Sequence, residues 1–185
     1  LERVPADRRD ERIWFYFGLE YAAHNEADKA IEAFEKYLPL SSVPDEKYLA
    51  YHYLGDLYRH KGAFDKAAER DLMALAMRPT WRDAYAGLLA TNVKKGDWQQ
   101  ALYYGARAKT ADPPDTPFAF NPVYQQVGWA GDYITALLNS NLYEEALKEC
   151  QDVLKIYPQD ENIQRVADDI RVALNQDYGA TSISE

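Results

Sequence analysis

A row of polar side chains between residues 52 and 60 offers the best chance of chemistry in this sequence. His52, Asp56 and His60 lie four residues apart, with Arg59 beside the last of them. On a helix this spacing places the three side chains on one face. Imidazole and carboxylate groups bind metal ions, but one straight helix spreads positions i to i+8 over about 12 Å. Three ligands at that spread cannot close on a single ion, so the row favours a polar binding strip over a metal site.

Patterns that would support catalysis are missing from the sequence. It has no glycine-rich phosphate loop, no nucleophile elbow, and no Cys and His arranged with a third orienting group. We therefore expect no catalytic residues, no metal and no cofactor in this chain. The single cysteine, Cys150, cannot form an internal disulfide and lies in an amphipathic helical pattern. It is expected to be a buried apolar residue in a reducing compartment, which points to the cytoplasm.

Charge and hydropathy narrow the class of partner. Acidic residues outnumber basic ones by 30 to 21, the net charge is −9, and the basic pairs Arg8–Arg9 and Lys94–Lys95 are short. Binding to nucleic acid or to an anionic membrane depends on clustered Lys and Arg, so neither partner is expected. No stretch approaches the roughly 18 apolar residues of a membrane span. The chain opens on Leu1 rather than Met, and we expect it to be a segment of a longer polypeptide.

The elements that position the polar row follow from an internal repeat. Four alanines mark it, at Ala30, Ala67, Ala101 and Ala146, with steps of 37, 34 and 45 residues. Glycine and asparagine tolerate the left-handed backbone that ends a helix, alanine lets two helices approach closely, and proline stops a helix. Five residues before each alanine is a glycine or asparagine: Asn25, Gly62, Gly96 and Asn141. Three residues before each of the last three alanines is an aromatic residue: Phe64, Trp98 and Tyr143. Twelve residues after each of these three alanines is a proline: Pro79, Pro113 and Pro158.

This pattern predicts a series of helical hairpins. First helices are expected over 10–24, 47–60, 81–94 and 122–139, and second helices over 27–39, 64–77, 98–111 and 143–156. Residues 160–175 carry an apolar stripe backed by polar residues, which predicts a ninth helix that seals the open end of the stack: Ile163, Val166, Ala167, Ile170 and Leu174. The domain is therefore expected to cover 1–175, followed by a disordered tail over 176–185.

The repeat resembles the tetratricopeptide pattern W-x2-L-G-x2-Y…A-x3-F…P. The third repeat has Leu89 where the pattern has glycine, and the fourth keeps mainly its second half. The resemblance implies an all-α, right-handed α-solenoid of about four hairpins over 11–44, 48–81, 82–115 and 127–160, plus the capping helix. The residues that carry it are Trp14, Phe17, Gly18, Tyr21, Ala30 and Phe34; Tyr51, Leu54, Gly55, Tyr58, Ala67, Ala74 and Pro79; Tyr85, Leu88, Ala101, Ala108 and Pro113; and Tyr143, Ala146 and Pro158.

The same resemblance implies a concave groove lined by the first helices, and hence a scaffold that binds a protein or peptide. Charged groups on an inward helix face are seldom used for packing, so the polar set in the second repeat is expected to meet the partner. Phe15 and Leu19 have an alternative place in the core. The expected groove residues are Phe15, Tyr16 and Leu19; His52, Tyr53, Asp56, Arg59 and His60; Lys94; and Asp132, Thr135 and Asn139.

A second resemblance leaves an alternative function open. Residues 12–21, 118–124 and 143–147 are similar to the helical region that follows the catalytic domain in some bacterial and phage family-2 glycosyltransferases. It implies a non-catalytic accessory domain that positions an acceptor or holds a homo-oligomer, with a catalytic domain earlier in the same polypeptide. The proline-rich and phenylalanine-containing insertion over 114–122 either caps a gap between the third and fourth repeats or contacts a partner.

Overall fold

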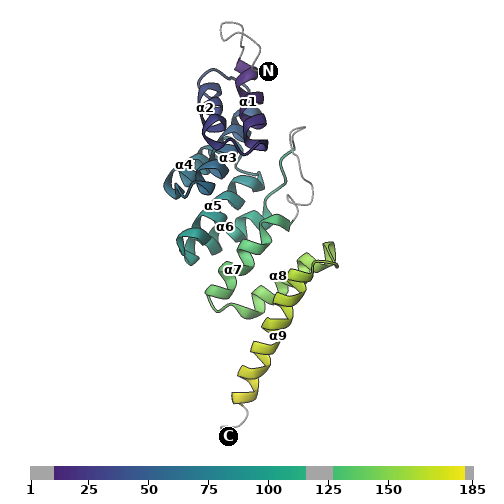
Figure 1. Cartoon of the computed structure of the whole chain (residues 1–185). Coiled ribbons are helices and arrows are strands. Elements are labelled where there is room, and N and C mark those ends of the chain that lie inside the picture. Colours follow the sequence, from purple (N-terminus) through teal and green to yellow (C-terminus); the bar gives the residue numbers. More distant parts are fainter. Residues whose placement is uncertain (1–10, 116–126, 182–185) are drawn as a thin grey trace.

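The computed structural model describes residues 11–115 and 127–181, and these ranges form a stack of helices (Figure 1). Their only pairing of the strand type is an isolated bridge between Trp81 and Asp112. The helices are α1 (Glu11–Ala23), α2 (Ala27–Tyr37), α3 (Pro44–His60), α4 (Phe64–Met77), α5 (Arg82–Lys95), α6 (Trp98–Thr110), α7 (Ala130–Asn139), α8 (Tyr143–Ile156) and α9 (Glu161–Thr181). The stack runs from α1 at one end to α9 at the other, so the expectation of an all-α solenoid is confirmed.

Each hairpin turns at the residue where the sequence predicted a left-handed backbone. Asn25, Gly62, Gly96 and Asn141 have φ angles of 59°, 72°, 72° and 58°. Few residues adopt this conformation without strain, and glycine and asparagine are the usual ones. The turns therefore join α1 to α2, α3 to α4, α5 to α6 and α7 to α8 at the predicted places.

The four marker alanines lie in the core of the stack. Ala30, Ala67, Ala101 and Ala146 are each 0% exposed. A larger side chain at these sites would push the paired helices apart, because protein cores are packed to the density of organic crystals. The interpretation of the alanine period as a packing period is confirmed.

The core follows the stack instead of forming one central cluster. The first hydrophobic cluster spans α1 to α5, the second is centred on α5 to α8, and the third joins α7, α8 and α9. Each helix thus packs mainly on its neighbours in sequence, as expected of a repeat protein. Across the described ranges, no helix combines the length and the apolar character needed to cross a bilayer.

Two helix boundaries differ from prediction by more than three residues. The seventh helix begins at Ala130, and residues 116–126, which hold most of the insertion and the start expected at 122, lie outside the described part of the chain. The last helix continues to Thr181, past the expected end at 175. Between 176 and 181 the poorest helix former is Gly179. A single glycine destabilises a helix by only about 1 kcal/mol relative to alanine. The tail expected over 176–185 therefore does not begin at 176, and residues 182–185 are not described.

Candidate functional site

A buried carboxylate lies at the centre of the second repeat. The side chain of Asp71, on α4, is 0% exposed. A Cβ atom on Gly55 of α3 or on Gly87 of α5 would overlap the Asp71 carboxylate, so both glycines make room for it. Burying a carboxylate is costly unless it is paired and hydrogen-bonded, and the neighbouring helices must supply its partners.

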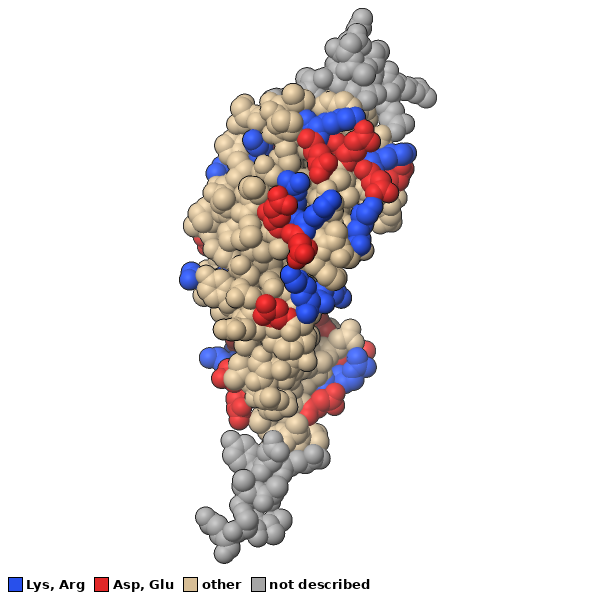
Figure 2. All heavy atoms as spheres, turned by 90° about the vertical axis from the view of Figure 1, so that its left-hand side faces the viewer, with Lys and Arg blue, Asp and Glu red and all other residues tan. Residues whose placement is uncertain are grey.

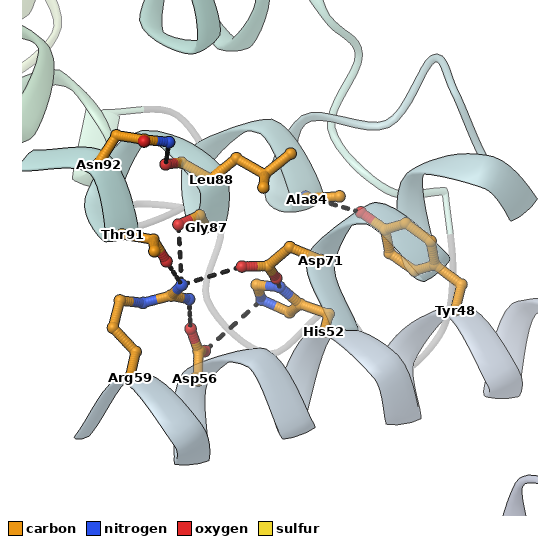
Figure 3. Close-up of polar contacts among 10 residues, drawn as sticks. All are labelled: Tyr48, His52, Asp56, Arg59, Asp71, Ala84, Gly87, Leu88, Thr91 and Asn92. Atoms are coloured by element: carbon orange, nitrogen blue, oxygen red, sulfur yellow. Dashed lines mark hydrogen bonds and ion pairs between the residues drawn. The ribbon is translucent and has the colours of Figure 1, made fainter. Parts of the chain in front are cut away.

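Arg59 supplies the main partner and ties three helices together (Figure 3). One terminal nitrogen of its guanidinium donates to Oδ2 of Asp71 at 2.9 Å, to the carbonyl oxygen of Gly87 at 2.8 Å and to Oγ1 of Thr91 at 2.6 Å. The other terminal nitrogen donates to Asp56. Because the Arg59 side chain is only 10% exposed, its charge is largely used inside the protein and links α3 to α4 and α5.

His52 completes this network from the same face of α3. Its Nδ1 lies 3.7 Å from Oδ1 of Asp71, and its Nε2 lies 3.7 Å from Oδ2 of Asp56. Burial lowers the pKa of His52, but the carboxylates of Asp56, Asp71 and Asp83 together outweigh burial and raise that pKa to about 9. His52 is therefore protonated near neutral pH and shares with Arg59 the task of balancing these carboxylates.

This network gives most of the polar row a structural role that the sequence analysis did not expect. Arg59 and the buried side of His52 pack between helices, because Asp71 demands positive charge at that depth. His60 is exposed and takes no part in the network within the described residues. Asp56 remains 42% exposed, so it alone of the row presents a carboxylate outward.

Asp71 itself was missed in the sequence analysis, although a signal was present. It stands four residues after Ala67, where the first repeat has Phe34 four residues after Ala30. A charge at a position that holds a buried ring in another repeat indicates either a broken repeat or a buried ion pair. Two glycines and an arginine on neighbouring helices favour the ion pair, but only their spatial meeting decides it.

A small cleft opens beside the network on the side of α5. It has a volume of about 30 Å³, close to one water molecule, and its walls include Asp56, Asp83 and Ala90. Burial raises the pKa of the Asp83 carboxyl, Asp56 raises it further, and His52 and Arg82 oppose that rise. Within the described part of the chain, the Asp83 side chain accepts no hydrogen bond, which leaves its carboxylate available at the cleft.

A much larger apolar hollow lies between α1 and α3. Its volume is about 820 Å³, and Glu20 and His24 stand among apolar neighbours in its wall. Tyr53 is held in place by stacking on Phe34, with ring centroids 5.6 Å apart. The remaining wall consists of Tyr16, Leu19, Ala22 and Ala23. Three of the expected groove residues, Tyr16, Leu19 and Tyr53, therefore meet in one hollow.

Phe15 does not join them, and its expected place in the groove is wrong. Its side chain is 0% exposed and its ring packs against Phe34 and Tyr37, with centroids 6.1 Å and 5.1 Å away. On a helix, neighbouring positions point about 100° apart, so Phe15 faces α2 while Tyr16 and Leu19 face the hollow. Of the two residues for which burial in the core was the alternative, Phe15 and Leu19, only Phe15 is fully buried.

The expected groove residues of the later repeats are spread along the stack. Lys94 is exposed, and Asp132 is half-buried, which raises the pKa of its carboxyl against the opposing charges of Lys94 and Arg59. The side chains of Thr135 and Asn139 bond within α7, to the carbonyl oxygens of Gly131 and Thr135, each at 2.8 Å. These four residues line neither the cleft nor the hollow described above.

On one face of the molecule, the distribution of charge does not mark a competing site. On the face shown in Figure 2, positive and negative side chains alternate, and neither sign forms a continuous area. Such interspersed charges form exposed ion pairs that contribute little to stability or to recognition. The hollow and the cleft together remain the best-formed candidate for a binding site.

Comparison with known proteins identifies the fold. No protein-family profile matches the chain, and no curated protein matches it in sequence. Among solved structures, MamA superposes with a TM-score of 0.70 at 19% identity and covers 93% of this chain and 86% of its own. YrrB, described as a TPR protein with an unusual peptide-binding site, gives 0.67 at 21% identity over 90% of this chain and 78% of its own.

A third structure, the Cut9–Hcn1 hetero-tetramer of the APC/C, gives a TM-score of 0.67 at 18% identity over 89% of this chain and 30% of that chain. At such low sequence identities, the structural similarity is evidence for the fold alone. It agrees with the hairpin turns, the buried alanines and the stacked core described above. The chain therefore has the tetratricopeptide-repeat fold, an α-solenoid of stacked helical hairpins.

Proposed function

We propose that this chain is a non-catalytic scaffold that binds an extended segment of a partner protein along α1, α3 and α5. The observation that carries the proposal is the apolar hollow of about 820 Å³ between α1 and α3. Its size falls within the range of about 300–1,000 Å³ that is usual for ligand sites. A hollow bounded by the side chains of helices offers no free strand edge, so the partner must be held by its side chains.

The chemistry of the hollow favours a peptide over a small metabolite. Tyr16 is 39% exposed and Leu19 is half-buried, so both have apolar surface that a partner could cover. The hollow is open to solvent, and its Tyr53 is next in sequence to His52 of the cleft, so one extended segment could contact both. Aromatic residues in such a position often contribute much of the binding free energy of an interface.

The similar structures support this class of function without identifying a partner. YrrB is described as having a peptide-binding site, and Cut9 is found in an assembly with Hcn1. No observation favours the alternative of a glycosyltransferase accessory domain. The similarity that suggested it lies partly in residues 118–124, all of which fall outside the described ranges.

The test is selection of random twelve-residue peptides displayed on phage against the whole chain, followed by titration of the best binder. Tyr16→Ser should weaken its binding about tenfold or more, because an aromatic contact in the hollow is lost. Tyr103→Ser is the matched control, since Tyr103 is 51% exposed but lies on α6, away from the hollow. Peptides that bind both variants and the parent chain equally would refute the hollow as the binding site.

A further inference from the structure

The surroundings of the apolar hollow carry a consistent charge. Glu20 stands in its wall on α1, and its side chain is exposed. On the opposite side, burial first and then the carboxylates of Asp56 and Asp83 raise the pKa of Tyr53 to about 12. These two carboxylates line the cleft, while the ring of Tyr53 lies in the wall of the hollow. An apolar site is thus bordered by negative charge on two sides.

The positive groups nearby are already committed to the protein itself. Arg59 donates to Asp71, Gly87, Thr91 and Asp56. Arg82 donates from Nε to the carbonyl oxygen of Ala108 at 2.8 Å and from a terminal nitrogen to that of Ala111 at 2.7 Å, at the end of α6. The carbonyl end of a helix carries partial negative charge, so it holds this guanidinium.

Among the described residues, Asp83 is consequently the carboxylate of the cleft that lacks a hydrogen-bond donor. It is half-buried beside a cleft, and none of its hydrogen-bonding capacity is used within the described part of the chain. A partly desolvated carboxylate gains more from a cation than a fully hydrated one does, because the local dielectric constant is lower. The group that it suits is a guanidinium or an ammonium.

We propose that the hollow and the cleft together recognise a basic, apolar peptide: a bulky apolar side chain fills the hollow, and an Arg or Lys nearby pairs with Asp83 and Asp56. This inference rests on the proposed function, because it names the chemistry of the peptide that the same groove takes. Tyr53 and Asp56 are about one helical turn, or roughly 5 Å, apart along α3. An extended chain advances about 3.3 Å per residue, so the basic residue lies two residues from the apolar one.

Three labelled peptides test the charge preference directly by fluorescence anisotropy. The first is Gly-Ser-Leu-Leu-Gly-Arg-Gly-Ser, and the other two replace its Arg by Gln or by Glu. At low salt the Arg peptide should bind about tenfold more tightly than the Glu peptide, with the Gln peptide between them. The difference should shrink as added salt screens the charges.

Variants of the protein test which carboxylate causes the preference for the Arg peptide. Asp83→Asn should abolish most of the difference between the Arg and Gln peptides, because it removes the proposed counter-ion with little change in shape. Glu69→Gln changes the net charge equally but lies exposed on α4, and it should leave the preference unchanged. Circular dichroism and thermal melting check that each variant is folded. If Asp83→Asn fails to fold, Glu20→Gln in the hollow wall should still reduce the preference.

The possible failures are distinguishable. Equal binding of the three peptides, or an Arg preference that survives Asp83→Asn, overturns the basic-peptide inference and leaves the proposed function standing. The same holds if the three peptides do not bind while peptides selected from the random library still bind in the hollow. If no peptide from either source binds, both proposals fall.

Discussion

At the scale of single residues, the second repeat shows how one substitution within a repeat sets requirements on its neighbours. Where the first repeat buries Phe34, the second buries Asp71. A ring needs only apolar contacts, whereas a carboxylate needs positive charge and hydrogen bonds at the same depth. Arg59, His52, and the space left by Gly55 and Gly87 meet those needs together.

The pKa of His52 makes stability depend on pH. Three carboxylates, on α3, α4 and α5, raise that pKa from its ordinary 6.5 to about 9 in the folded protein. The folded state therefore holds the proton more tightly than the unfolded state does. The stabilisation is complete below about pH 6.5 and is lost as the pH rises through about 9.

Urea unfolding at about pH 6 and about pH 9 should show this loss as a fall of roughly 1–3 kcal/mol in the free energy of unfolding. His52→Gln should remove most of the difference between the two pH values. His60→Gln is the control, because His60 is exposed on the same helix. A pH dependence that is unchanged in His52→Gln would contradict the assignment of the proton to this residue.

At the scale of helices, the contact between α6 and α7 depends on a glycine that the repeat pattern does not require. Gly105 is buried on α6, and a Cβ there would overlap the ring of Tyr133 on α7. It occupies the position that Phe34 and Asp71 hold in the earlier repeats. The fourth repeat thus inserts an aromatic ring from its first helix into the gap left by the third repeat.

Gly105→Ala should destabilise the protein by roughly 1–3 kcal/mol, because overpacking against a stiff ring exceeds the gain in helix propensity. Gly131→Ala is the matched control. Gly131 is also helical, lies on α7, and has no atom within 4 Å of its ideal Cβ position. It should be neutral or stabilise by up to about 1 kcal/mol. Thermal melting of both variants gives the comparison, and a stabilising Gly105→Ala would argue against the close contact with Tyr133.

At the scale of the whole molecule, stability should be distributed along the stack. Cys150, Ala146 and Ile134 form a cluster that α9 covers through Ala167 and Ile170. The cluster that includes Phe34 and Tyr48 has no member on α9. In a repeat protein the energy is approximately a sum of neighbouring contacts, so damage at one end should weaken with distance.

A variant that ends at Asp160 removes α9 and should expose the cluster on α7 and α8. Hydrogen exchange should then accelerate strongly in α7 and α8 and only slightly in α1 to α4, because the cluster of the first repeats keeps its contacts. Mass spectrometry of peptide fragments from the parent and the variant measures this gradient. A uniform loss of protection from α1 to α8 would instead mean that the stack unfolds as one cooperative unit.

The sequence alone determined the hairpins, because their causes are local. A left-handed turn at Asn25 or Gly62 and an alanine at the helix contact follow from the chemistry of a few adjacent residues, and their period fixes the stack. It also predicted that Tyr16, Leu19 and Tyr53 share the inward faces of first helices, and these three residues line one apolar hollow. The same reasoning could not predict that Phe15 is buried instead, because burial of a side chain depends on which residues of the neighbouring helix lie against it.

Only the tertiary structure decided how charge is used between α3, α4 and α5. The sequence predicts Arg59 as a binding residue, and the structure adds a structural role, because Asp71, twelve positions away and on another helix, lies 2.9 Å from it. Asp83 accepts no hydrogen bond within the described ranges, although the charge of His52 on α3 acts on it. Whether a charge pairs inward or faces a partner depends on distances between helices, and a sequence period fixes the order of those helices but not which side chains meet.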